Sequence, residues 1–224
     1  MFALALTVFA GFFPVSPTAA TGEAVKPIVD NERVMVRDVT WPKGASSPSS
    51  PSMRPVFDTL SVYLAGGTMK VTRPDGKSVT VVRKVGDVVF EPKYTVKTEE
   101  NAGDGEPVRA IVIALLDRKV APLGNTSGYP NAFPRPGAKK LIDNNRVVVW
   151  DYTFTSGQPS PMHFHDKDVV VVYMENGSLK STTPDGQSQV NPNSFGLTKF
   201  NARNRTHTER LVSGASRVIA VELK

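Results

Sequence analysis

Two histidines separated by one residue, His163 and His165, stand at the start of a run of β-branched residues. In an extended backbone alternate side chains point to the same face, so both imidazoles can converge on one point if this segment is a strand. The third histidine of the chain, His207, lies in another β-like run, 205–209. A lone histidine is more often a surface or core residue than a metal ligand. A His-x-His pair together with a third histidine, which leaves a coordination position open, is typical of a metal site.

The stretch around the histidine pair resembles the first sequence motif of the cupin family. That motif runs Gly, five residues, His-x-His, three or four residues, Glu, six residues and Gly, and it is matched here by Gly157, His163, His165 and Gly177. The resemblance implies that His163 and His165 are ligands of one divalent transition metal ion, with Zn, Fe, Ni, Mn and Cu all compatible with imidazole ligands.

A degenerate form of the second cupin motif follows between Gly186 and His207. The Pro-x-Gly of that motif is reduced to residues 192–194, Pro-Asn-Ser, and the spacing to the histidine is longer than in the family pattern. The resemblance implies that His207 is the third metal ligand.

The position at which the cupin motif has its glutamate is occupied by Val170. If Val170 points into the barrel, the fourth ligand is water, the substrate or a nearby acid. Asp168 has the strand parity of Val170, and Glu209 has that of His207, so either carboxylate could reach inward. Solvated carboxylates at strand ends are the commoner outcome, and the sequence leaves the fourth ligand open.

Two charged residues flank His207 at two-residue spacing, and on a regular strand they share its face. Arg205 could hold a substrate carboxylate through a bidentate pair, and Glu209 could act as a general acid or base. The alternative is that the two pair with each other. The catalytic candidates are therefore Arg205, Glu209 and Asp168, whereas Trp150 and Tyr173 are interpreted as packing residues.

The chain contains an internal duplication, because three segments recur in the same order: 30–41 as 143–154, 67–76 as 177–186, and 109–115 as 217–223. The period of about 110 residues is far longer than a solenoid repeat, so two homologous domains are expected. Aligning the halves places Met53, Pro55 and Lys97 opposite the three histidines. The first half therefore has no imidazole with which to bind a metal in the same way.

Short β-branched runs separated by Gly, Pro, Asn and Asp fill both halves and predict an all-β protein. Pro-Asp-Gly at 74–76 and 184–186 predicts a hairpin turn, with the glycine at positive φ. The cupin resemblance implies two tandem jelly-roll β-barrels. The expected strands are 32–41, 57–64, 68–73, 78–84, 87–91, 94–99 and 107–116 in the first half, and 145–154, 168–175, 178–183, 196–200, 205–212 and 216–223 in the second.

The expected domain organisation has four parts: a signal peptide at 1–20, an N-terminal barrel without metal ligands at 21–117, an interdomain crossover at 118–142, and a metal-binding C-terminal barrel at 143–224. The first segment is apolar and ends in small residues, although it lacks a basic start, and indicates a periplasmic or secreted protein. A buried N-terminal helix is the alternative. The crossover carries Tyr129 and Phe133, which could pack it onto a barrel, and a flexible linker is the alternative there.

Composition narrows the function classes. The absence of cysteine excludes disulfides, thiolate metal ligands and cysteine nucleophiles. The net charge of +6 comes from scattered basic residues, so no nucleic-acid partner is expected, nor a membrane span after processing.

The expected partner is a small-molecule substrate or ligand, and a homodimer could form through an exposed sheet unless the two barrels satisfy that contact within one chain. Two functions remain open: a metalloenzyme, with dioxygenase-type chemistry as the leading class, and a non-enzymatic periplasmic binding protein for a metal or small ligand. A storage protein with a vestigial metal site is a third, less favoured alternative.

Overall fold

The computed structural model of the chain describes residues 26–46, 56–96, 98–118, 120 and 123–224. These residues form strands and turns without a helix, which confirms the all-β prediction. Within this part of the chain there is accordingly no long apolar helix that could span a membrane. The expected signal peptide at 1–20 lies outside the described residues, as do Met53, Pro55 and Lys97.

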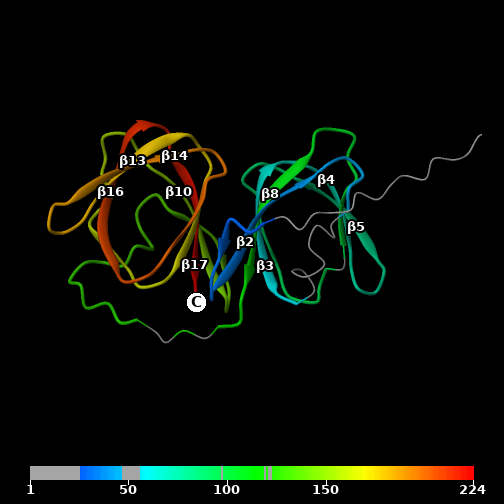
Figure 1. Cartoon of the computed structure of the whole chain (residues 1–224), viewed down its shortest axis with the longest axis horizontal. Helices are drawn as coiled ribbons and strands as arrows, with labels where there is room; N and C mark the ends of the chain where they lie inside the picture. Colours follow the sequence, from blue (N-terminus) through cyan, green and yellow to red (C-terminus); the bar gives the residue numbers. More distant parts are fainter. Residues whose placement is uncertain (1–25, 47–55, 97, 119, 121–122) are drawn as a thin grey trace, which may run out of the picture.

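The first half forms a barrel of two sheets whose strands all pair antiparallel (Figure 1). The larger sheet has the order β1-β2-β8-β3-β6, and the smaller has the order β5-β4-β7. The strands are β1 Val29–Asp30, β2 Val34–Trp41, β3 Asp58–Ala65, β4 Gly67–Thr72, β5 Ser78–Arg83, β6 Val88–Glu91, β7 Thr98–Asn101 and β8 Val108–Leu115.

The second half repeats this architecture, with sheets of order β15-β12-β17-β10-β9 and β11-β16-β13-β14. The first strand of this barrel, β9, begins at Lys139, before the domain boundary at 143 that the sequence predicted. The strands are β9 Lys139–Asp143, β10 Val147–Thr153, β11 His163–His165, β12 Val169–Tyr173, β13 Gly177–Thr182, β14 Ser188–Asn193, β15 Thr198–Asn201, β16 Arg205–Gly214 and β17 Arg217–Leu223.

Both Pro-Asp-Gly segments form the predicted hairpin turns. Gly76 and Gly186 have φ of 84°, a value that residues with a side chain rarely adopt. Each turn joins equivalent strands, β4 to β5 and β13 to β14. Strand β14 was not predicted, because its sequence is rich in Gln, Asn and Pro and most of it faces solvent.

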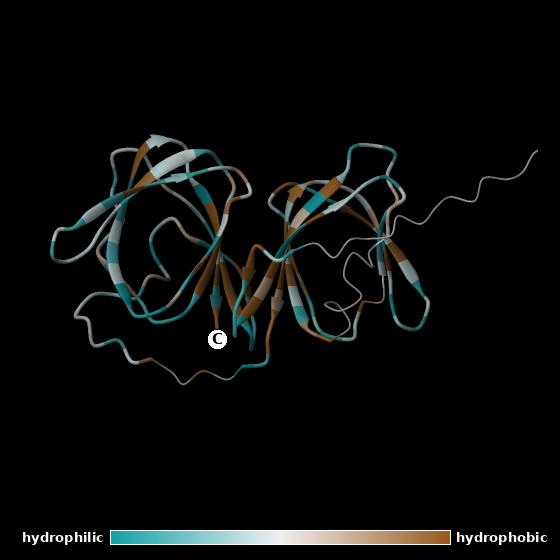
Figure 2. Cartoon of the chain, viewed as in Figure 1, coloured by the Kyte–Doolittle hydropathy of each residue, from teal (hydrophilic) through white to brown (hydrophobic). Residues whose placement is uncertain are grey.

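The two barrels share one hydrophobic core, which fills the space where their larger sheets face each other. Figure 2 shows this as hydrophobic strands gathered at the centre of the molecule. Half of the residues come from each barrel, and each has its duplicated counterpart on the other side: Val34, Val36, Leu60, Val62, Leu64, Ile111, Ile113 and Leu115 face Val147, Val149, Val170, Val172, Met174, Ile219, Val221 and Leu223. The duplication has thus produced a pseudo-symmetric interface inside one chain.

Charged residues repeat this pseudo-symmetry at the edge of the interface. Arg109 forms a bidentate pair with Asp38, and Arg217 forms the same pair with Asp151. A Cβ added to Gly196 would lie 3.2 Å from the Arg109 guanidinium, and one added to Gly86 would lie 3.2 Å from that of Arg217. Each arginine therefore packs against a glycine of the opposite barrel.

Side chains alternate along the strands, so the residues between the interface positions point into the barrels. In the N-terminal barrel these inward residues form one buried cluster that combines the large Trp41, Tyr63 and Met69 with the small Ala110 and Ala114. In the C-terminal barrel the inward face is divided into two smaller clusters, around Trp150 and around Phe154. The two barrels share a fold but differ in how their interiors are filled.

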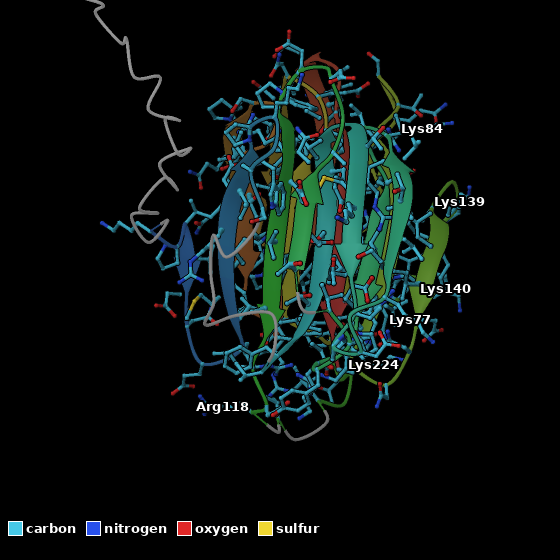
Figure 3. The ribbon with its side chains drawn as sticks, turned by 90° about the vertical axis from the view of Figure 1, so that its right-hand side faces the viewer. Lys77, Lys84, Arg118, Lys139, Lys140 and Lys224 are labelled. Atoms are coloured by element: carbon cyan, nitrogen blue, oxygen red, sulfur yellow. The ribbon has the colours of Figure 1, made fainter. Side chains whose placement is uncertain are left out.

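The lysines and the arginine labelled in Figure 3 are exposed residues at the surface of the molecule, where Lys140 and Lys224 pair with Asp143. The net charge of +6 is thus carried partly by groups remote from the barrel interiors.

The shared core predicts that the barrels unfold together. Ile113→Ala should lower the free energy of unfolding by about 3 kcal/mol, since it leaves a cavity in a fully buried site. Each barrel has one tryptophan, Trp41 or Trp150, so urea unfolding followed by fluorescence in Trp41→Phe and Trp150→Phe backgrounds reports each barrel separately. Both midpoints should move with Ile113→Ala.

The matched control for this experiment is Val79→Ala, because Val79 is 49% exposed and its truncation should change stability by less than about 0.5 kcal/mol. A shift of the N-terminal midpoint alone would show that the barrels are independent.

Candidate metal centre

The three histidines meet because β11 pairs antiparallel with β16. In this register His163 lies directly opposite His207, and His165 lies opposite Arg205. Residues directly opposite each other in a ladder project to the same face, and the two-residue period adds His165 to that face. The ring centroids are 4.8–5.0 Å apart, and the nitrogens that could bind a metal all lie within 4.8 Å of one another.

The chemistry of these nitrogens fits a metal ion. All three side chains are buried. His163 Nδ1 lies 2.8 Å from the carbonyl oxygen of Pro161, which can only accept, so Nδ1 carries the proton and Nε2 presents its lone pair. His163 Nε2 and both ring nitrogens of His165 have no hydrogen-bond partner among the described residues. Buried polar atoms are rarely left without a partner, and a bound cation would supply one.

Burial also keeps the imidazoles neutral, which is the form that binds a metal. Burial lowers the pKa of His163 to about 4, helped by the positive charge of Arg135. Burial likewise lowers the pKa of His207 to about 4, with Arg205 as the next cause. The pKa of His165 is lowered further, again chiefly by burial and then by Arg205.

Neither Val170 nor Asp168, the two positions near β12 that the sequence analysis considered for a fourth metal ligand, faces the histidines. Val170 does not point into the barrel, because it packs in the core between the two barrels, and the inward positions of β12 are Val169 and Val171. Asp168 does share the parity of Val170, as predicted, and it therefore also faces the first barrel. Its carboxylate pairs with Arg33 at 3.1 Å and accepts a hydrogen bond from the Arg203 backbone N–H, so it is removed from the histidine cluster.

Glu209 is the carboxylate that lies beside the histidines. Its Oε2 is 3.9 Å from His207 Nε2 and 3.7 Å from Nη1 of Arg135. The ion pair that Glu209 makes is thus with Arg135, and not with Arg205 as the sequence suggested as an alternative. The cluster whose ligand atoms all lie within 4.8 Å of one another consists of the three histidines, and Glu209 lies beside it through its contact with His207.

Arg135 comes from the crossover, which is bound to the free edge of β11. The Phe164 N–H donates to the Pro130 carbonyl at 2.8 Å, and the Ala132 N–H donates to the Phe164 carbonyl at 2.7 Å. Phe133 stacks on Trp150 with ring centroids 5.2 Å apart, whereas Tyr129 remains 38% exposed. The crossover therefore fixes the strand that carries two of the histidines.

The Arg135 side chain is held in place by several contacts and is only 7% exposed. Its Nε donates to the Ala132 carbonyl at 2.8 Å, and its guanidinium lies over the rings of Phe133 and Tyr152 at 4.3 and 4.9 Å. Sequence reasoning did not identify Arg135, because nothing in a proline-rich crossover marks one arginine as part of a site.

A cavity of about 520 Å³ opens beside the histidines inside the C-terminal barrel. His165, His207 and Glu209 line it together with Arg205 and with Lys199, a second residue that the sequence analysis did not single out. Arg135 also lines it, and the rest of its wall is uncharged and includes Phe154, Val169, Val171, Tyr173, Leu179, Gln189, Asn191, Asn201 and Val218. Burial raises the pKa of Tyr173 to about 12, so its phenol stays neutral.

A further buried acid, Glu222, also escaped the sequence analysis. It is 3% exposed, its Oε2 accepts the Trp150 indole N–H at 2.8 Å, and burial raises its pKa. It does not line the cavity. Because it is buried and bonded to Trp150, we interpret Glu222 as part of the packing around that side chain.

No protein-family model matches the chain. One curated protein, the beta-alanine degradation protein BauB of Pseudomonas aeruginosa, is 37% identical over 60 residues, which are 27% of this chain and 59% of BauB. The chain thus matches less than two thirds of that relative.

Solved structures resemble the chain over most of its length. A cupin 2 conserved barrel domain protein from Leptotrichia buccalis has a TM-score of 0.55 at 13% identity, covering 88% of this chain and 87% of that one. AerE from Microcystis aeruginosa has a TM-score of 0.56 at 12% identity, with 90% and 97% covered. Bacillus subtilis oxalate decarboxylase, described with Mn(II) centres, has a TM-score of 0.57 at 9% identity, with 86% and 69% covered.

Acid should destabilise the metal-free protein. His163 and His207 have a pKa of about 4 when folded, against about 6.5 for an exposed imidazole, so the unfolded chain binds more protons between these values. The stabilisation is complete above pH 6.5 and is lost as the pH falls towards 4. We expect the free energy of unfolding to fall by roughly 2 kcal/mol for each of these two histidines between pH 7.5 and pH 5.

Urea titrations of the metal-free protein at pH 7.5, 6 and 5 measure this loss, in a range where most carboxyl groups stay ionised. The His163→Gln/His207→Gln variant should show a much flatter pH dependence. An equally steep loss in that variant would contradict the assignment to the histidines.

Proposed function

Because this chain has the cupin fold in two tandem barrels, we propose that its C-terminal barrel holds one divalent metal ion and acts on a small organic molecule. The observation that supports this most directly is the meeting of three buried, neutral imidazoles beside a cavity that His165 and His207 line. The N-terminal barrel, which has no histidine at the equivalent positions, would act as the structural partner.

In this proposal His163, His165 and His207 hold the ion, and Glu209 is the nearest carboxylate that can complete its ligand set. An ion held there would polarise an oxygen atom of a bound molecule or activate water. Three imidazoles with one carboxylate suit several first-row metals, so the ligand set does not select one of them.

The chain's own residues define what happens around such an ion. Glu209 lies between His207 and Arg135, where its carboxylate can accept a proton from a molecule in the cavity. Arg135 fixes this carboxylate from the crossover side. Phe154 and Leu179 provide apolar surface in the same cavity, against which the carbon skeleton of a bound molecule can pack.

Two of the similar proteins have names that refer to small carboxylates or their breakdown, namely oxalate decarboxylase and the beta-alanine degradation protein. These names support a small organic molecule as the substrate of this chain. Among enzymatic reactions, we propose dioxygenase-type chemistry as the first to test.

Non-enzymatic binding of a small ligand is the second candidate, and one observation favours it. Glu209 is engaged by Arg135, and Tyr173, with a pKa of about 12, is a weak acid. The cavity therefore has few groups free for proton transfer, as in a site that binds without reacting.

Elemental analysis of the purified protein tests the metal centre. We expect about one transition metal ion per chain, and less than a tenth of that in the His163→Ala/His207→Ala variant, because the remaining imidazole is a weak site on its own. Arg210→Gln, which changes an exposed residue of the same strand, is the matched control and should keep its metal. Equal metal in all three proteins would refute the site.

Oxygen uptake by the metal-loaded protein separates the enzyme from the binder. We expect uptake with at least one member of a panel of small phenols, thiols and diketones. Glu209→Gln should lower the rate per bound metal ion by about 100-fold, since general acid–base groups contribute about 10²–10⁴-fold. Saturable binding of a panel member without any turnover would identify the protein as a binder.

A further inference from the structure

One wall of the C-terminal cavity is cationic and is built from a single short stretch of chain. Lys199 and Asn201 alternate along β15 and both line the cavity, and the turn after β15 leads to Arg205, the first residue of β16. Arg205 lies directly opposite His165 in the ladder, which places its side chain next to the histidine cluster. The cationic wall and the metal ligands therefore adjoin.

Neither cation of this wall has a carboxylate partner within the described parts of the chain. The Arg205 Nε donates to the Ala202 carbonyl at 2.6 Å, a contact that fixes the side chain but does not neutralise it. Lys199 Nζ lies 5.7 Å from the centre of the Tyr173 ring. Glu209 and Asp168 act on the Arg205 charge from a distance, but neither forms an ion pair with it. Half-buried cations without a direct anionic partner cost free energy, so their position facing a cavity favours a negative ligand.

The duplicated barrel provides an internal comparison. The positions equivalent to Lys199, Asn201 and Arg205 in the first half are Val89, Glu91 and Thr95. In that barrel the Glu91 carboxylate already has a cationic partner, because Arg73 donates to it at 2.9 Å. Arg73 also donates to the Thr95 carbonyl at 3.0 Å. The two wall cations thus occur in the barrel that has the histidines and are missing from the one that lacks them.

The charges in the cavity are out of balance. Arg135, Lys199 and Arg205 supply three positive charges, and Glu209 supplies the negative one, which Arg135 already binds. A divalent ion on the histidines would add to the positive excess. The remaining lining is uncharged and mixes apolar side chains, such as Phe154, Leu179 and Val218, with amides and hydroxyls, so the space suits an organic body with one anionic end.

We propose that this cavity binds a small organic carboxylate, held at its anionic end by Arg205 and Lys199. The inference rests on the proposed function, because it concerns the substrate class of the same site. The Arg205 guanidinium matches the geometry of a carboxylate, and Lys199 adds a point charge beside it. Glu209 repels a second carboxylate near His207, so the neutral end of the ligand faces the histidines and Glu209.

Isothermal titration calorimetry with matched pairs of probes tests this proposal. Benzoate with benzamide, and propionate with propionamide, differ in charge but hardly in shape. We expect the metal-loaded protein to bind each carboxylate about 10- to 100-fold more tightly than its amide, as hydrogen bonds to charged groups are worth about 1.5–3 kcal/mol.

Variants of Arg205 and Lys199 test whether these two residues cause the preference for carboxylates over amides. Arg205→Gln and Lys199→Gln should each weaken carboxylate binding about 10-fold, with amide binding and metal content unchanged. Arg205→Lys should fall between wild type and Arg205→Gln, because it keeps the charge and loses the bidentate geometry. Arg210→Gln, an exposed change on the same strand, should behave as wild type.

The possible results separate the two proposals. Equal binding of carboxylate and amide by metal-loaded protein, or full selectivity in both Gln variants, would overturn the carboxylate proposal and leave the metal centre intact. Carboxylate selectivity that depends on Arg205 in a protein that binds no metal would overturn the proposed function and support the anion site.

Discussion

The register between β11 and β16 is the constraint on which the site depends. Strand β11 is three residues long, and the antiparallel ladder sets His163 opposite His207 and His165 opposite Arg205. A shift of one residue would turn the imidazoles of one strand to the opposite face. Such a short strand cannot fix its own register, and it is held on its other edge by the crossover through Phe164. The crossover that joins the barrels therefore also maintains the geometry of the histidine cluster.

A second constraint is that the larger sheet of each barrel is buried on both faces. On β12, Val170 and Val172 fill the core between the barrels, and Val169 and Val171 line the cavity. The duplicated chain meets the need to cover its exposed sheets by packing one barrel on the other, in the way that a symmetric dimer would. With that need met by the fold, the two interiors are free to differ: one buries Trp41 and Tyr63, and the other has a cavity lined by His165 and His207.

Much of this arrangement could be predicted from the sequence, because it follows from local periodicity. The duplication, the β class, the Pro-Asp-Gly turns and the inward face shared by His163, His165 and His207 are all properties of alternation and turn chemistry. What could not be predicted depends on contacts between distant segments. The alternating pattern of a run of valines does not show which face is inside, so the sequence left open whether Val170 and Asp168 reach the cavity, and both lie at the interface. Arg135 and Lys199 become site residues through the docking of the crossover and the position of β15.

The central claim is that three imidazoles bind one metal ion, and X-ray absorption spectroscopy of the metal-loaded protein at the metal edge tests it most directly. The account predicts a first shell that contains three imidazole nitrogens at about 2.0–2.2 Å with the multiple-scattering pattern of histidine rings. A first shell made up only of oxygen atoms, without that pattern, would contradict it.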